Sequence, residues 1–174
     1  MTPVQDEWFD VVNERDEVVD RKTRREVHAT GLWHRAVHVL VFDPEGRVFL
    51  QKRSILKDLS PGLWDSSCSG HLDSGEDYDA AAVRELGEEI GVKIIQAPER
   101  WFRINACEQT GWEFVWVYRM TGYTGAITID EKEIQFGEWV EPTEVTARMA
   151  KRPADFCPSF KLLWPMVVER LAGQ

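Results

Sequence analysis

The sequence predicts a mixed fold of the α/β or α+β class, in which strands and helices pack in layers. Apolar runs of strand length occur on both sides of one segment, residues 77–90, whose apolar residues recur at spacings of three and four. With 174 residues, 43% of them hydrophobic, the chain has one domain's length and enough apolar material for a core. We therefore expect a single domain over residues 1–174.

The N-terminal part of the chain is expected to form strands. Two short apolar runs around a polar turn predict an N-terminal hairpin extension at about residues 8–21. A second hairpin is predicted for residues 36–42 and 47–53, because the Asp-Pro-Glu-Gly sequence between them has a proline that presets a turn and a glycine that accepts a positive φ. Residues 63–67 are expected to form a short strand.

Residues 77–90 carry the clearest helix signal. Asp77 is placed to cap the first turn, and Gly91 is placed to end the helix in a left-handed conformation. Beyond this helix, apolar runs predict strands at 92–96, 112–120 and 133–140, a helix that opens at Pro142, and a helix over 159–171 that is interrupted or kinked at Pro165.

Charge and composition exclude several classes of protein. The net charge of −9 argues against a nonspecific nucleic-acid binder, which needs a basic surface. The longest apolar run has five residues, whereas a membrane-spanning helix needs roughly 20. The acidic N-terminus lacks the pattern of a secretory signal, and the three cysteines have no disulfide or metal-site spacing. We therefore expect a cytoplasmic protein.

The negative charge is concentrated in one segment. Residues 70–92 hold seven acidic residues and one basic residue, a net charge of −6. On a helical wheel, Glu85, Glu88 and Glu89 fall within about 100° of one another, on the side away from the apolar face. Hard divalent cations such as Mg²⁺ prefer oxygen ligands of this kind. The helix alone is also explained by a solvated acidic face, and the residues around the helix decide between the two.

The spacing within this segment resembles the Nudix box at every specified position. In order, it consists of Gly70, five residues, Glu76, seven residues, Arg84-Glu85-Leu86, one residue, Glu88-Glu89, one residue and Gly91-Val92. The resemblance implies a Nudix-type α/β/α sandwich with a mixed sheet. It also implies that the Gly70 carbonyl and Glu85, Glu88 and Glu89 ligate Mg²⁺ or Mn²⁺, while Arg84 and Glu76 form a supporting ion pair.

A looser similarity extends over most of residues 8–120 and points to type I isopentenyl-diphosphate isomerase, a Nudix-fold enzyme that does not hydrolyse its substrate. That isomerase has a second metal site of three histidines and two glutamates. His28, His34 and His71 are similar to the three histidines, with a one-residue spacing difference at His28, and Glu113 resembles one of the acids. The other acid is replaced by Gly111.

The catalytic position of the isomerase is not matched. The family has a cysteine two residues before a histidine, and Ser69 stands there, with Cys68 shifted by one residue. Neighbouring side chains of an extended segment point to opposite faces, so Cys68 cannot replace that cysteine, and a serine hydroxyl is a much weaker acid than a thiol. Because the Nudix box is complete, we favour hydrolysis of a diphosphate bond over isomerisation; a non-catalytic metabolite-binding module is a third reading.

The expected substrate is a small-molecule diphosphate, a nucleoside di- or triphosphate or another nucleoside diphosphate derivative, attacked by water at phosphorus with Mg²⁺ or Mn²⁺. Lys52 and Arg53 are candidates for phosphate binding. The proton acceptor is one of the ligand-shell glutamates, or Glu108 or Glu113. The group joined to the diphosphate is expected to be selected elsewhere on the sheet and around residues 156–164. No nucleic-acid or membrane partner is expected, and no oligomeric state is predicted.

Overall fold

The computed structural model describes residues 7–174. Residues 1–6, which belong to the expected domain and to the N-terminal segment judged to lack a secretory signal, lie outside the described residues. The strands are β1 (Trp8–Val12), β2 (Val18–Thr23), β3 (His34–Val41), β4 (Val48–Arg53), β5 (Trp64–Asp65), β6 (Cys68–His71), β7 (Glu99–Ile104), β8 (Glu113–Met120) and β9 (Ile134–Val140). The α-helices are α1 (Arg24–Thr30), α2 (Tyr78–Ile90), α3 (Pro142–Lys151) and α4 (Pro158–Ala172), and the short 3₁₀ helices are η2 (Glu108–Thr110) and η3 (Pro153–Asp155).

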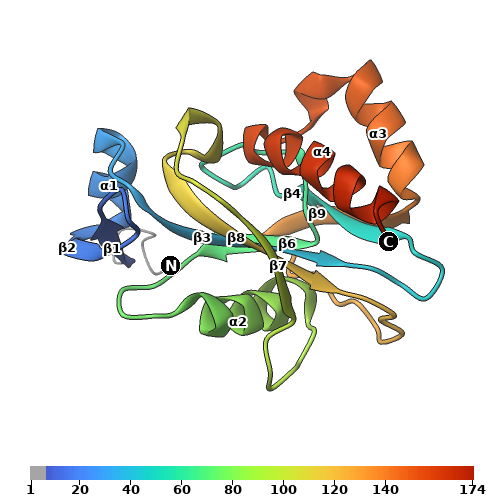
Figure 1. Ribbon diagram of the computed structural model, residues 1–174, viewed down its shortest axis with the longest axis horizontal. Coiled ribbons are helices and arrows are strands. Elements are labelled where there is room, and N and C mark those ends of the chain that lie inside the picture. Colours follow the sequence, from blue (N-terminus) through green and yellow to red (C-terminus); the bar gives the residue numbers. More distant parts are fainter. Residues whose placement is uncertain (1–6) are drawn as a thin grey trace.

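The strands form a mixed set of sheets between layers of helices. One sheet has the order β6-β3-β8-β7, a second has the order β5-β4-β9, and β1 and β2 form a two-stranded hairpin. The pair β3 and β8 is parallel, while all other strand pairs of the described residues are antiparallel. Helix α2 covers one face of the sheets, and α3 and α4 lie on the opposite face (Figure 1). The predicted mixed fold class and the α/β/α sandwich are therefore confirmed.

Two apolar cores lie on the two faces of the sheets. Alternate residues of β3 belong to different cores, as the two-residue period of a strand requires. Val37 and Val39 pack with Leu86 and Ile90 of α2, whereas Leu40 packs with the α4 side. The α4 core also contains Phe156, Phe160, Leu163 and Trp164, all of them buried. This C-terminal segment therefore builds the interior, and the expectation that residues 156–164 select the substrate is wrong for these four side chains.

The N-terminal hairpin is present, and α1 follows it directly at one end of the molecule (Figure 1). Helix α1 is absent from the sequence predictions. Its signal was nevertheless available, because Thr23 accepts a hydrogen bond from the Glu26 backbone while the Glu26 carboxylate accepts one from the Thr23 backbone. This capping box and Gly31 in the left-handed conformation delimit a helix of only two turns, too short for a clear apolar period.

The expected second hairpin is only partly correct. The turn forms, with the Gly46 backbone donating to the Asp43 carbonyl at 3.0 Å. However, β3 and β4 join different sheets, and only an isolated bridge between Phe42 and Val48 connects them. The predicted turn is therefore confirmed. Longer-range pairing of β3 with β8 and of β4 with β9 places the two strands in different sheets.

The strand expected at residues 92–96 does not form. Val92 packs in the core beneath α2, and its backbone donates to the Leu86 carbonyl at the end of the helix, while Ile95 is fully exposed. The strand in this region is β7, several residues further on. Of the strand expected at 63–67, only Trp64 and Asp65 form a strand, β5, and the next strand, β6, begins at Cys68.

Helix α4 differs from the sequence prediction at Pro165. The helix continues through this residue, so it is not interrupted there. Pro165 lies on the exposed side of the helix. Among the described residues 7–174, no helix has the length and apolar character needed to cross a membrane.

Close packing between β4 and β9 predicts an intolerance to side chains at Gly137. A Cβ atom at Gly137 would lie 2.2 Å from the Phe49 ring, and Phe49 is buried. We expect Gly137→Ala to lower the free energy of unfolding by about 1–3 kcal/mol, measured by urea unfolding. Gly87→Ala is the matched control, because nothing lies closer than 3.9 Å and alanine favours a helix, so it should be neutral or stabilising. Equal effects of the two substitutions would contradict the packing argument.

Candidate functional site

Helix α2 presents its acidic residues to strand β6. Asp77 caps the helix by accepting a hydrogen bond from the Ala80 backbone, and Gly91 ends it in the left-handed conformation, both as predicted. Gly70 of β6 faces Glu85 so closely that a Cβ atom there would lie 2.0 Å from Glu85 Oε1. Only glycine therefore lets the Glu85 carboxylate and the Gly70 backbone share this space.

The three glutamates of the helix differ in their surroundings. Glu85 and Glu89 are buried, with 8% and 3% exposure, whereas Glu88 is exposed. On the helical wheel all three lie away from the apolar face of α2. In the structure β6 and β4 cover Glu85 and Glu89 on that side, and Glu88 is left exposed. Glu89 Oε2 accepts hydrogen bonds from the Gln51 side chain at 3.0 Å and the Ser69 backbone at 3.1 Å.

Arg84 joins the acidic residues into one network. Its guanidinium donates to both oxygens of Glu76, at 2.9 and 2.8 Å, which confirms the contact expected of this pair. It also donates to Glu85 at 2.7 Å, to Glu88 at 3.2 Å and to the backbone carbonyl of His71 at 3.0 Å. Arg84 therefore helps to fix the positions of Glu85 and Glu88.

Burial makes the negative charges of this site costly. Burial, and then the nearby charge of Glu89, raises the pKa of Glu85 above its usual range. Burial also raises the pKa of Glu89, although Lys57 opposes the shift. Lys57 forms an ion pair with Glu133 in the segment before β9, and no motif predicts this pair. Two buried carboxylates that share one region and retain an excess of negative charge are a suitable environment for a divalent cation.

Three histidines and one glutamate form a second cluster. His28, His34, His71 and Glu113 each offer one ligand atom, and these atoms all lie within 4.8 Å of one another. His34 and Glu113 are directly opposite in the parallel pair of β3 and β8, while His71 ends β6 and His28 comes from α1. The structure thus brings together all four residues of the second candidate metal site.

The hydrogen bonding of this cluster leaves lone pairs that face inward. His34 Nδ1 lies 2.8 Å from the Leu32 carbonyl and must donate to it, so the neutral ring has its lone pair on Nε2. That Nε2 lies 3.4 Å from Glu113 Oε1, yet its geometry there makes no hydrogen bond. His28 Nε2 is also buried without a hydrogen-bond partner among the described residues. A cation bound by nitrogen and oxygen would satisfy these atoms.

Burial and the neighbouring charges shift the pKa values of His28, His71 and Glu113. Burial, and then the charges of the other two histidines, lowers the pKa of His28 to about 4. The pKa of His71 is lowered as well, mainly by burial. Burial by itself would raise the pKa of Glu113, but His71 and His34 hold it well below its usual range. At neutral pH, His28 and His71 are therefore neutral and Glu113 is ionised, the protonation states that metal ligands need.

An aromatic side chain that no sequence motif singles out lies against this cluster. Phe9 of β1 stacks on His71 and His34, with ring centroids at 4.8 and 5.6 Å, and it tilts against His28 at 5.9 Å. Phe9 is 1% exposed, so it closes one side of the cluster against solvent. The N-terminal hairpin is thus part of this site.

The two residues at the isomerase position point to different surroundings. Cys68 is fully buried in the core beneath α2, and burial raises the pKa of its thiol well above its usual range. Ser69 is partly exposed, and its hydroxyl lies 3.4 Å from Asp65 Oδ2. Cys68 therefore cannot act as a solvent-accessible acid, in agreement with the strand alternation argued from the sequence.

The remaining candidate residues, Lys52, Arg53 and Glu108, lie apart from the carboxylate site. Lys52 points to the opposite face of β4 from Gln51 and lies over the Trp64 ring. Arg53 donates to the Leu59 carbonyl and approaches Asp65 at 3.5 Å, so it holds the loop that follows β4. Glu108 is exposed on η2. None of these three has a direct contact with the helix carboxylates.

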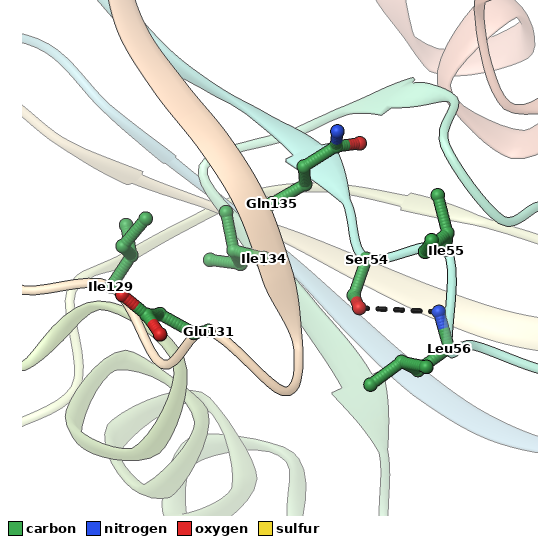
Figure 2. Close-up of a pocket in the computed structure, with 7 residues that line it drawn as sticks. All are labelled: Ser54, Ile55, Leu56, Ile129, Glu131, Ile134 and Gln135. Carbon is green, nitrogen blue, oxygen red and sulfur yellow. Dashed lines mark hydrogen bonds between the residues drawn. The ribbon is translucent and has the colours of Figure 1, made fainter.

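A pocket of about 380 Å³ opens at the C-terminal end of α2. Figure 2 shows Ser54, Ile55 and Leu56 on one side and Ile129 and Glu131 on the other, with Ile134 and Gln135 of β9 between them. The pocket adjoins the carboxylate site, because the Asp130 backbone donates to the Glu89 carbonyl and the Ser54 backbone donates to the Glu133 carbonyl, each at 2.9 Å. Ile55 and Leu56 are 71% and 77% exposed.

Comparison with known proteins gives consistent matches. Residues 32–160 match the family described as NUDIX domain. An uncharacterized Nudix hydrolase of Streptomyces coelicolor is 34% identical over 149 residues, which cover 84% of this chain and 81% of the relative. An isopentenyl-diphosphate Δ-isomerase of Nocardia farcinica is 39% identical over 131 residues, 74% of this chain and 75% of that enzyme. The crystal structure of DR0079 from Deinococcus radiodurans superposes with a TM-score of 0.72 and 30% identity over 83% of this chain and 90% of that one.

The low pKa of His28 predicts a pH dependence of stability in protein freed of metal with EDTA. The unfolded chain binds a proton at His28 below about pH 6.5, whereas the folded chain binds it only near the folded value of about 4. The free energy of unfolding should therefore fall as the pH is lowered through this range, by up to about 3 kcal/mol more in the wild type than in His28→Gln. Urea unfolding at about pH 7 and about pH 4.5 measures it; equal losses in both proteins would contradict the prediction.

Proposed function

Because the chain belongs to the NUDIX family, whose hydrolases act on pyrophosphate bonds, we propose that it is a metal-dependent pyrophosphohydrolase. Its proposed substrate is a nucleoside di- or triphosphate or another nucleoside diphosphate derivative, in which water attacks phosphorus. The observation that carries this proposal is the close approach of Glu85 to Gly70 beside buried Glu89, held by the Arg84 network.

The residues present fit a divalent cation at this site. Gly70, Glu85, Glu88 and Glu89 supply oxygen ligands only, as Mg²⁺ or Mn²⁺ requires, and two of the carboxylates are buried without a full complement of positive charge. When bound, the cation neutralises the diphosphate and makes a coordinated water more acidic. Arg84 and Glu76 keep the carboxylates in place and do not themselves need to contact the substrate.

The contacts favour a helix glutamate as the proton acceptor. Glu113 is engaged with His71 at 2.8 Å and with His34, and Glu108 lies exposed on η2. Glu88 is exposed at the edge of the carboxylate site, with one contact to Arg84 at 3.2 Å. Glu88 thus combines exposure to solvent with a place in the carboxylate site, which neither Glu113 nor Glu108 does. We therefore favour Glu88 as the acceptor of the proton from the attacking water.

An isomerase is the second candidate function, favoured by the Nocardia relative and by the histidine cluster. His28, His34, His71 and Glu113 fit a transition metal such as Zn²⁺ or Mn²⁺, because buried ring nitrogens lack partners there. Ser69 and the inaccessible Cys68 argue against isomerisation, which needs a strong proton donor beside the substrate. We therefore assign this cluster to a second cation in a hydrolase.

We further assign the pocket next to Glu89 to the group that is joined to the diphosphate. Its aliphatic walls, Ile55 and Leu56 on one side and Ile129 and Ile134 on the other, suit a flat ring such as a nucleobase. Glu131 and Gln135 offer hydrogen-bonding groups at its edge. Lys57, paired with Glu133 between this pocket and Glu89, is positioned to meet a phosphate oxygen.

A substrate panel tests the reaction class. The protein is incubated with Mg²⁺ and nucleoside di- and triphosphates, nucleotide sugars, dinucleotides and isoprenyl diphosphates, and the products are identified by mass. We expect hydrolysis of a nucleotide, and Glu89→Gln should lower kcat at least ~10-fold while Glu45→Gln, an exposed acid of a distant turn, leaves it unchanged. Interconversion of isoprenyl diphosphates without phosphate release would show an isomerase, and binding without turnover at any Mg²⁺ concentration would show a binding module.

The pocket assignment predicts a change in KM. Leu56→Ala removes an apolar wall of the pocket, so it should raise the KM of the best nucleotide substrate several-fold with little change in kcat. Leu59→Ala is the control, because Leu59 is exposed in the same loop but does not line the pocket. Equal KM values for the two variants would remove the support for this pocket.

A further inference from the structure

We infer that the two cation sites are energetically coupled, and that Asp10 of the β1–β2 hairpin is a positioning residue that transmits part of this coupling. The inference rests on the proposed function, because it takes both sites as cation sites. It concerns the way in which occupancy of the histidine cluster prepares the carboxylate site. Each connection between the two sites is a direct contact.

The first connection runs through strand β6, where adjacent residues serve different sites. Gly70 faces Glu85 on the α2 side, and the His71 ring joins the histidine cluster on the other side. The backbone carbonyl of His71 accepts a hydrogen bond from Arg84 Nη2 at 3.0 Å. His71, a candidate ligand in the histidine cluster, is thus adjacent in sequence to Gly70 of the carboxylate site. The His71 carbonyl also binds Arg84, the residue that orients Glu85.

The second connection runs through the hairpin. Phe9 packs on the rings of His34 and His71. The next residue, Asp10, accepts hydrogen bonds from the Ser74 hydroxyl at 2.7 Å and the Gly75 backbone at 2.9 Å, and the Trp8 carbonyl accepts one from the Ser74 backbone at 2.7 Å. Strand β1 therefore packs on the histidines and, at adjacent residues, holds the loop between β6 and α2.

That loop carries the residue that holds Arg84. Glu76 follows Gly75 directly, its carboxylate accepts from the Asp73 backbone at 3.0 Å, and both its oxygens bind Arg84. The chain of contacts therefore runs from Phe9 and Asp10 through the loop to Glu76, Arg84 and the helix carboxylates. Asp10 does not contact any candidate cation ligand itself, so its action is one of positioning.

The far end of the hairpin is fixed to the same helix. Asp16, in the turn, has a positive φ of 61°, a costly conformation for a residue with a side chain. Its carboxylate accepts from Arg35 at 2.7 Å and from the hydroxyl of Tyr78, the first residue of α2, at 2.8 Å. The hairpin is thus hydrogen-bonded both to the loop and to the start of α2.

These contacts predict the sign of the coupling. A cation in the histidine cluster orders His71 and the ring of Phe9, and this ordering extends to the loop and to Arg84. Binding of a second cation, at the carboxylate site, then costs less conformational entropy, so that cation binds more tightly. Two cations also repel each other, which acts in the opposite direction; the shared rigid elements must outweigh that repulsion for positive coupling.

Calorimetry on the full chain tests the inference without any enzymatic readout. The Mg²⁺ affinity is measured with and without one equivalent of Zn²⁺, whose preference for imidazole directs it to the histidine cluster. We expect Zn²⁺ to tighten Mg²⁺ binding by about fivefold or more, the lower end of common allosteric couplings. Zn²⁺ should also slow amide hydrogen exchange in the peptide that covers residues 72–77. In His28→Gln, which weakens the cluster, both effects should shrink.

Asp10→Ala should lose most of the Zn²⁺ effect on Mg²⁺ affinity, while Asp20→Ala keeps it. Asp20 lies on the same hairpin and carries the same charge, and its carboxylate accepts from the Arg21 backbone and pairs with Lys22, both of them its neighbours on β2. Ser74→Ala, which removes one of the two hydrogen bonds to Asp10, gives a milder test if Asp10→Ala fails to fold. If Zn²⁺ and Mg²⁺ bind independently in the wild type, or if Asp10→Ala behaves like Asp20→Ala, the inference is overturned. If neither metal binds, the proposed function itself fails.

Discussion

The burial of Glu85 and Glu89 between α2 and the sheet is the constraint on which the surrounding structure depends. Two carboxylates taken out of water are tolerable only with strong partners or a cation. The glycine at position 70, the hydrogen bonds to Glu89 and the placement of Arg84 all serve these two side chains. The charge of one 23-residue segment thus shapes the packing of three neighbouring elements.

Much of this arrangement could be predicted from the sequence, because it is local. The caps of α2, the spacing of its glutamates and the turn before β4 depend on residues within a few positions of one another. Burial of Glu85 could not be predicted in this way, since it depends on β6, and a wheel shows only the helix itself. Likewise, the residues at 92–96 have the apolar character of a strand, yet Val92 serves to close α2.

The parts that sequence reasoning missed are those that distant segments create. Phe9 looks like any apolar strand residue until β1 is placed beside three histidines. The pair Lys57 and Glu133 joins two loops with no shared motif. The hairpin lies outside the matched family region, 32–160, and yet it contacts the loop of the carboxylate site and encloses the histidine cluster. A family boundary drawn on sequence similarity therefore cuts through a structural unit of this chain.

The parallel pairing of β3 with β8 has a consequence for how the molecule is assembled. It places His34 directly opposite Glu113, although nearly half of the chain separates them. Parallel pairing of this kind closes a long loop, which makes it a slow, non-local event in folding. During synthesis, a ribosome-bound chain that ends before β8 holds all three histidines without their carboxylate. The cluster can thus be completed only once β8 has been made and has paired with β3, and a metal that needs all four ligands would be acquired only after that step.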